Sequence, residues 1–153
     1  MTTSVPVGRS AVVVVAGAAL AALALLGAGC GSRAADLIAV QRSGDIPGAR
    51  LTMVMTDDGR VRCNNGPDRM VTSRQLIDAR EIVRALEGED DAVGPADRGV
   101  RLAPGRDSIL RYDVRIEAGS VGFADTSRGQ PPAFFRIAGL TRAVAKGPCG
   151  LPR

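Results

Sequence analysis

The chain has 153 residues, a formal net charge of +4 and neither histidine nor tryptophan. Without histidine it lacks the usual general base near neutral pH, the usual activator of serine or cysteine nucleophiles and the commonest metal ligand. Serine–histidine and cysteine–histidine catalysis are therefore excluded, as are zinc sites built on histidine. The single lysine is Lys146, and the arginines are not clustered with aromatic residues, so nucleic-acid binding has no support.

The N-terminal segment has the layout of a secretory signal peptide. Residues 1–10 are polar and carry Arg9, residues 11–29 contain no charge, and Cys30 follows directly after small residues. The uncharged run approaches the roughly 20 residues of a membrane-spanning helix, so a retained N-terminal anchor is the alternative. The many alanines and glycines of this run lower its hydrophobicity, so a signal peptide that comprises residues 1–29 is favoured over a retained anchor.

The residues before Cys30 resemble a bacterial lipobox, with Leu26, Gly27, Ala28 and Gly29 leading to the cysteine. In that family a diacylglycerol group is attached to the cysteine sulfur, and cleavage leaves the cysteine as the first residue. The resemblance implies lipid on Cys30, a tether over residues 30–36 and a location on the outer face of the bacterial cell membrane. Two or three acyl chains anchor a protein stably, whereas one alone is marginal.

Lipidation of Cys30 would leave two cysteines, Cys63 and Cys149. An even pair in an exported domain predicts a disulfide, and the chain-entropy estimate for a loop of this length is about 4–5 kcal/mol. Two buried free thiols are the alternative. A metal site is disfavoured, because two cysteines without histidine cannot complete an ordinary zinc shell.

Residues 37–153 have the size of one domain. Residues 37–40 predict a first strand. Alternating apolar residues over 51–56, then Asp57-Asp58-Gly59 and a short run to Cys63, predict a hairpin. Residues 64–70 read as a turn-rich connection, and Thr72 with Gln75 predicts a capping box before a helix that runs to about Leu86.

The second half repeats this plan. Residues 110–116 and 121–123 predict another hairpin, and the prolines before Phe134 predict the start of a second helix that ends at Gly147. Residues 87–98 read as a mobile acidic loop. The expected fold is α+β, with a mostly antiparallel sheet of two hairpins plus an N-terminal strand and two amphipathic helices on one face.

Carboxylates are the chemically active groups that remain. Asp57 and Asp58 occupy turn positions, and Asp113 and Asp125 lie in or beside strands without any pattern that pairs them. Glu87, Glu89, Asp90 and Asp91 form an acidic cluster without the ligand spacing of a calcium loop, so solvated charge is the simpler interpretation and loose calcium binding the alternative. No catalytic residue, cofactor or metal ligand is predicted.

Two stretches resemble emfourin-type proteins, which inhibit protealysin and other thermolysin-like metalloproteases. Residues 40–48 are similar to the family's opening strand and Arg-Ser-Gly-Gly-like turn, with Asp45 in place of the second glycine. Residues 107–117 are similar to its second strand pair, and residues 125–140 to its closing segment. The resemblance implies a partner-binding surface, which would comprise Arg42, Ser43, Gly44, Asp45 and Gly48. For Gly44 and Gly48 the simpler interpretation is a loop that needs positive φ.

Three functions remain open. The first is a membrane-tethered, non-catalytic binding module whose partner is an exported metalloprotease. The second is an envelope-assembly or structural lipoprotein that contacts another exported protein, for which a broad apolar patch opposite the helices would be evidence. The third is an enzyme that uses carboxylates only, which requires two of them facing across a pocket.

Overall fold

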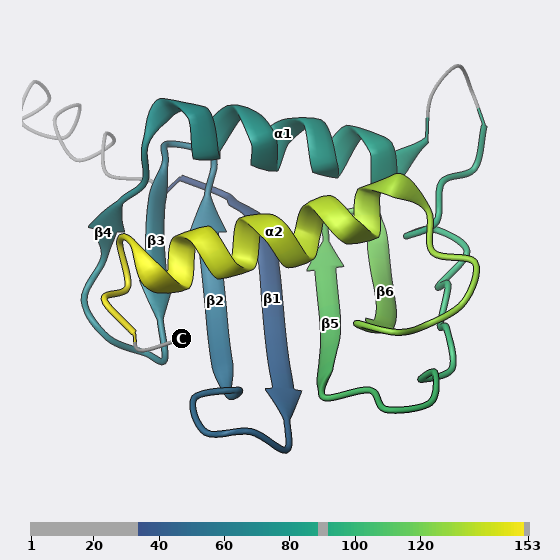
Figure 1. Cartoon of the computed structure of the whole chain (residues 1–153). Helices are drawn as coiled ribbons and strands as arrows, with labels where there is room; N and C mark the ends of the chain where they lie inside the picture. The colour runs from purple at the N-terminus through teal and green to yellow at the C-terminus, as the bar shows by residue number, and fades with distance from the viewer. Residues whose placement is uncertain (1–33, 89–91, 152–153) are drawn as a thin grey trace, which may run out of the picture. The chain divides into compact units, whose positions relative to one another are not determined.

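The computed structural model describes residues 34–88 and 92–151. Its elements are β1 (Asp36–Gly44), β2 (Leu51–Thr56), β3 (Arg60–Cys63), β4 (Arg69–Met70), α1 (Ser73–Glu87), β5 (Leu110–Ile116), β6 (Gly119–Ala124) and α2 (Pro132–Lys146). They form one antiparallel sheet with two helices, so the predicted α+β class is confirmed (Figure 1).

The two predicted hairpins lie on either side of the first strand. The strand order is β4-β3-β2-β1-β5-β6, and every neighbouring pair is antiparallel. In the middle of β1, Val40 is opposite Met53 of β2 and Val114 of β5. The nine-residue strand β1 therefore joins the hairpins into one sheet.

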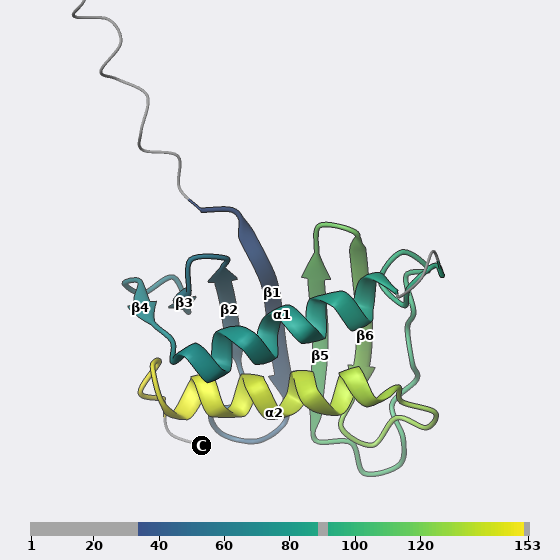
Figure 2. The same ribbon diagram turned by 90° about the horizontal axis from the view of Figure 1, so that it is seen from above.

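One face of this sheet is apolar and both helices cover it (Figures 1 and 2). Along β5, buried Tyr112, Val114 and Ile116 alternate with exposed residues, as the period of a strand requires. The helices contribute stripes at helical spacing, which are Ala79, Ile82, Val83 and Leu86 from α1 and Ala133, Phe134, Ile137, Leu140, Thr141, Val144 and Ala145 from α2. The segment Ala34–Arg153 forms one compact unit that contains this core, as a domain that folds independently requires.

The predicted local signals are present. Gly59 has φ 83° in the β2–β3 turn, and the Thr56 hydroxyl donates to Asp58 Oδ1 at 2.6 Å, which holds the pKa of Asp58 below its ordinary value. Thr72 and Gln75 form the capping box of α1. Pro131 and Pro132 begin α2.

Two connections are more ordered than the sequence predicts. The turn-rich segment 64–70 contains the short edge strand β4. In the segment predicted to be a mobile loop, Ala96 is buried, its N–H donates to Leu86 O at 3.0 Å, and its carbonyl accepts from Ser120 N at 3.2 Å. The described part of this segment has no helix or strand, in agreement with the loop prediction, and backbone hydrogen bonds attach it to the end of α1 and to β6. Glu89, Asp90 and Asp91 lie outside the described residues.

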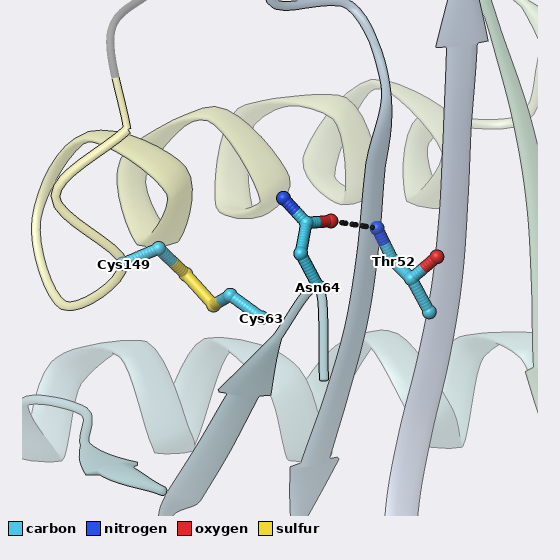
Figure 3. The surroundings of a disulfide bond; sticks show 4 residues. All are labelled: Thr52, Cys63, Asn64 and Cys149. Atoms are coloured by element: carbon cyan, nitrogen blue, oxygen red, sulfur yellow. Dashed lines mark hydrogen bonds between the residues drawn. A yellow bond between two sulfur atoms is a disulfide. The ribbon is translucent and has the colours of Figure 1, made fainter. Parts of the chain in front are cut away.

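The predicted disulfide between Cys63 and Cys149 is confirmed, with the Cα atoms 5.9 Å apart (Figure 3). Cys63 ends β3, and Cys149 follows α2. The neighbouring Asn64 has φ 50°, and its side-chain Oδ1 accepts from Thr52 N at 2.9 Å. The disulfide thus fastens the end of α2 to the edge hairpin.

Removing the crosslink should destabilise the domain. For the variant Cys63→Ala/Cys149→Ala of residues 34–153, we expect the free energy of unfolding to fall by about 2–5 kcal/mol, since the unfolded chain regains the entropy of an open loop. Urea denaturation measures this fall. As a control, peptide mapping of the parent protein without reduction should show Cys63 joined to Cys149. Equal urea midpoints for the variant and the oxidised protein would contradict the expectation.

Candidate functional site

The predicted partner-binding segment begins with a buried cation. Ile38, Val40 and Arg42 follow one another on the core face of β1, so the alternation places Arg42 at a core position. It is flanked on the neighbouring strands by Leu51 and Tyr112, and only 7% of its surface is exposed. A charge at such a position must find hydrogen-bond partners, because burying it unpaired is costly.

The loop between β1 and β2 supplies those partners. Arg42 Nε donates to Ala49 O at 2.8 Å, and Arg42 Nη2 donates to Gly48 O at 2.9 Å. Within the loop, Ala49 N donates to Ile46 O at 3.1 Å, and Gly48 adopts φ 75°. Arg42 therefore fixes the conformation of the loop from inside, while Ile46 remains 42% exposed at its surface.

The other residues of the predicted surface have different positions. Ser43 and Asp45 are exposed, and so is Gly48, whose positive φ confirms the interpretation as a loop glycine. For Gly44 that interpretation was wrong: it pairs with Leu110 in the sheet, and a Cβ there would collide with the carbonyl of Ile109. Glycine is required at position 44 by a close backbone approach.

A cavity of about 330 Å³ lies beside the fixed loop. Its apolar lining includes Ile46, Ala49 and Leu110, and its three charged residues are all basic, namely Arg42, Arg142 and Lys146. Among residues 34–88 and 92–151, no ion pair joins any of these three cations to a carboxylate. The cavity is therefore apolar and electropositive.

A second cavity, of about 350 Å³, adjoins the first and shares Leu110 and Arg142 with it. Its lining includes Ile109, Tyr112, Phe123 and Phe135, with one carboxylate, Asp125. Burial raises the pKa of the Tyr112 phenol above its ordinary value, and the positive charges of Arg42 and Arg142 oppose that rise. Arg42 and Arg142 therefore both act to lower the pKa of the same phenol.

The carboxylates considered in the sequence analysis have separate partners. Asp57 pairs with Arg80, Asp58 with Arg60 and Asp113 with Arg101, while Asp125 Oδ1 accepts from Ile109 N at 3.2 Å. No two of these four line one cavity among those found beside the described elements. In residues 34–88 and 92–151, no group of three histidine, cysteine, aspartate or glutamate side chains could hold a metal ion.

The sheet face opposite the helices bears mostly polar residues. Its central hollow is lined by Gln41, Thr52, Arg101, Asp113 and Arg115 around the small Ala39. Three of the six large apolar side chains that are exposed in the described residues border the two cavities, namely Ile46, Ile109 and Phe135, which are 42%, 47% and 60% exposed. Ile77, Met70 and Val93 are exposed elsewhere.

Sequence reasoning missed Arg142 and Lys146 and the role of Arg42. The signal for Arg42 is present in the chain, since the alternation of Ile38 and Val40 continues to it. Arg142 and Lys146 are one helical turn apart on α2. Their approach to a loop almost 100 residues earlier in the chain depends on the tertiary fold.

No protein-family model, curated protein or solved structure matches the chain. The proposed signal peptide and Cys30 lie outside the described residues. Neither helix within residues 34–88 and 92–151 is long and apolar enough to cross a membrane.

Replacing Arg42 tests whether it fixes the loop. For Arg42→Met, which keeps an apolar stem, we expect the free energy of unfolding to fall by about 1–3 kcal/mol, because the Ala49 and Gly48 carbonyls lose their donors. Amide hydrogen exchange in residues 45–49 should also accelerate. The matched control is Arg111→Met, an exposed arginine on the other sheet face, which should change stability by less than about 0.5 kcal/mol. Equal effects of the two substitutions would contradict the role given to Arg42.

Proposed function

We propose that this chain is an exported bacterial lipoprotein whose folded domain is a non-catalytic binding module on the outer face of the cell membrane. The lipobox-like residues before Cys30 support the anchor. The Cys63–Cys149 disulfide supports an extracytoplasmic location, since such bonds persist in oxidising compartments.

The observation that carries the binding function is the loop between β1 and β2. Arg42 holds this loop through two carbonyl oxygens, and the loop presents the apolar side chain of Ile46 to solvent. A loop ordered before binding loses less conformational entropy when a partner binds, which raises affinity. No catalytic side chain is required for this function.

The partner that we propose is a thermolysin-like metalloprotease exported to the same compartment. This part of the proposal rests on the resemblance of residues 40–48 to the opening of emfourin-type inhibitors. The fixed loop supports it, because in most protease–inhibitor complexes the interface backbone is nearly the same in the free and bound states. Ser43, Asp45 and Gly48 are the exposed residues of the predicted surface that would surround Ile46.

Lipid attachment has a direct test in the full-length protein. Replacing Cys30 with serine should abolish acylation and either release the protein from membranes or leave the precursor uncleaved, because serine has no sulfur for the thioether. Membrane fractionation and intact-mass measurement report both effects, with Cys63→Ser/Cys149→Ser as the control that keeps Cys30. An unchanged acylated mass in the Cys30→Ser protein would rule out this anchor.

Protease inhibition is tested by titrating residues 34–153 against a panel of thermolysin-like metalloproteases, including those exported by the same organism. We expect stoichiometric inhibition that Ile46→Asp weakens by at least about tenfold, since a carboxylate would replace an apolar contact at the loop. Ile77→Asp is the control, because Ile77 is also exposed, at 53% against 42% for Ile46, but lies on α1.

Absence of inhibition across the panel would withdraw the protease as partner. Cross-linking on intact cells would then test the second candidate, a structural envelope protein. If the Ile46→Asp and Ile77→Asp proteins inhibit equally strongly, the protease remains the partner but its contact lies away from the loop.

A further inference from the structure

Helix α2 has an outward stripe besides its core face. Phe135, Ala138 and Arg142 recur at spacings of three and four residues, and Ala145, which is buried at the edge of the core face, follows three residues later. Of these, Phe135, Ala138 and Arg142 line the second cavity, and Arg142 and Ala145 line the first. The stripe therefore borders both cavities, which together we call the α2 groove.

One end of this groove carries the positive charge. The buried Arg42 has a guanidinium group with five N–H donors, of which two bind loop carbonyls; the other three have no hydrogen-bond partner among the described residues. Arg142 and Lys146 add two more cations at the same cavity. Because the loop holds Arg42 in place, its free donors form an anchored site for an anion, and a carboxylate matches the planar geometry of guanidinium.

The second cavity has a mixed lining, with one carboxylate, Asp125, and with Arg142 at its border with the first cavity. Ile109 and Phe135 are partly exposed beside Leu110 and Ala138, which gives an apolar surface in contact with water. Asp125 is the only ionisable acid at this end, so an anionic head group is repelled there and attracted to the cations. The cavity volumes of about 330 and 350 Å³ fall within the range of small-molecule sites.

From this arrangement we propose that the groove along α2 binds a long-chain fatty acid. The carboxylate lies at Arg42, Arg142 and Lys146, and the acyl chain passes Leu110 into the second cavity, against Ile109 and Phe135. This site shares Ile46 and Gly48 with the proposed protease contact, but calorimetry with the fatty acid alone and inhibition of the protease alone report on each ligand in turn. Fatty-acid binding and protease inhibition can therefore be measured independently, and failure of one does not imply failure of the other.

The binding experiment uses residues 34–153, freed of any copurified lipid by unfolding in urea and refolding. Isothermal titration calorimetry compares palmitate with hexadecanol, which has the chain but no charge, and with acetate, which has the charge but no chain. Palmitate should bind with one-to-one stoichiometry and at least about tenfold more tightly than either, because only palmitate fills both ends of the groove. No binding of palmitate, or equal affinity for hexadecanol, would overturn the proposal.

Charge variants test where the carboxylate lies. Arg142→Gln/Lys146→Gln should weaken palmitate binding by at least about tenfold, since two charge-assisted contacts are lost. Arg74→Gln/Arg84→Gln removes the same charge from exposed positions on α1 and should leave the affinity unchanged. If both double variants lose the same palmitate affinity, the effect is one of overall charge, and the proposed site is contradicted.

Gly139 offers a variant that blocks the chain without harming the fold. It lies on α2 beside the second cavity, and a Cβ there would meet no atom within 4 Å. Gly139→Leu should therefore fold at least as stably as the parent, since glycine disfavours helix, while its side chain shortens the groove. We expect palmitate affinity to fall at least about fivefold and acetate affinity to stay the same; unchanged palmitate affinity would contradict the path of the chain.

Tyr112 supplies a spectroscopic readout of the head group. It is the only tyrosine in the chain, and Arg42 and Arg142 lower the pKa of its phenol against the effect of burial. A bound carboxylate would cancel part of that positive charge, so palmitate should raise the pKa seen in the tyrosinate absorbance, whereas hexadecanol should not. An equal effect of both ligands would place the carboxylate away from these arginines.

Discussion

The site depends on one buried interaction, the hydrogen bonding of the Arg42 guanidinium to the carbonyls of Gly48 and Ala49. Because Arg42 continues the core face of β1, the strand that pairs with both hairpins, its position is fixed by the centre of the sheet. A buried cation requires acceptors, and the loop that leaves the same strand supplies two of them. The same interaction orders the loop, leaves Ile46 exposed and brings a charge to the wall of a cavity.

The elements of the fold are predictable because their signals are local. Asp58-Gly59, the Thr72–Gln75 capping box and Pro131-Pro132 each specify a turn or a helix start within a few residues, and the structure contains all three. The place of β1 between the hairpins is not encoded in this way, since its pairing with β5 joins residues about 70 positions apart. The order around Ala96 was missed for a related reason: its partners are backbone groups of Leu86 and Ser120, which leave no trace in side-chain pattern.

The candidate site was predicted only in part. The turn at residues 45–48 is indicated by its proline and glycine, and Gly48 has the positive φ that this implies. Gly44 looks the same in sequence, but its requirement comes from the backbone of Ile109 on a neighbouring strand. Likewise Arg142 and Lys146 look like the solvated face of a helix, and only the fold places them beside Arg42. Residues whose role depends on a distant neighbour were the ones that sequence reasoning did not find.

The loop between β1 and β2 has two surfaces, and Arg42 links them. Its outer surface carries Ile46, Asp45 and Ser43, whereas its inner carbonyls accept from a guanidinium that also lines the cavity. An anion in the cavity and a protein on the loop would thus act on the same side chain. If the anion changes the affinity of the loop for its partner, linkage requires the partner to change the affinity for the anion by the same factor. Only a change in the hydrogen bonds from Arg42 to Gly48 and Ala49 when the anion binds would produce such coupling, because interactions that are equal in both states cancel.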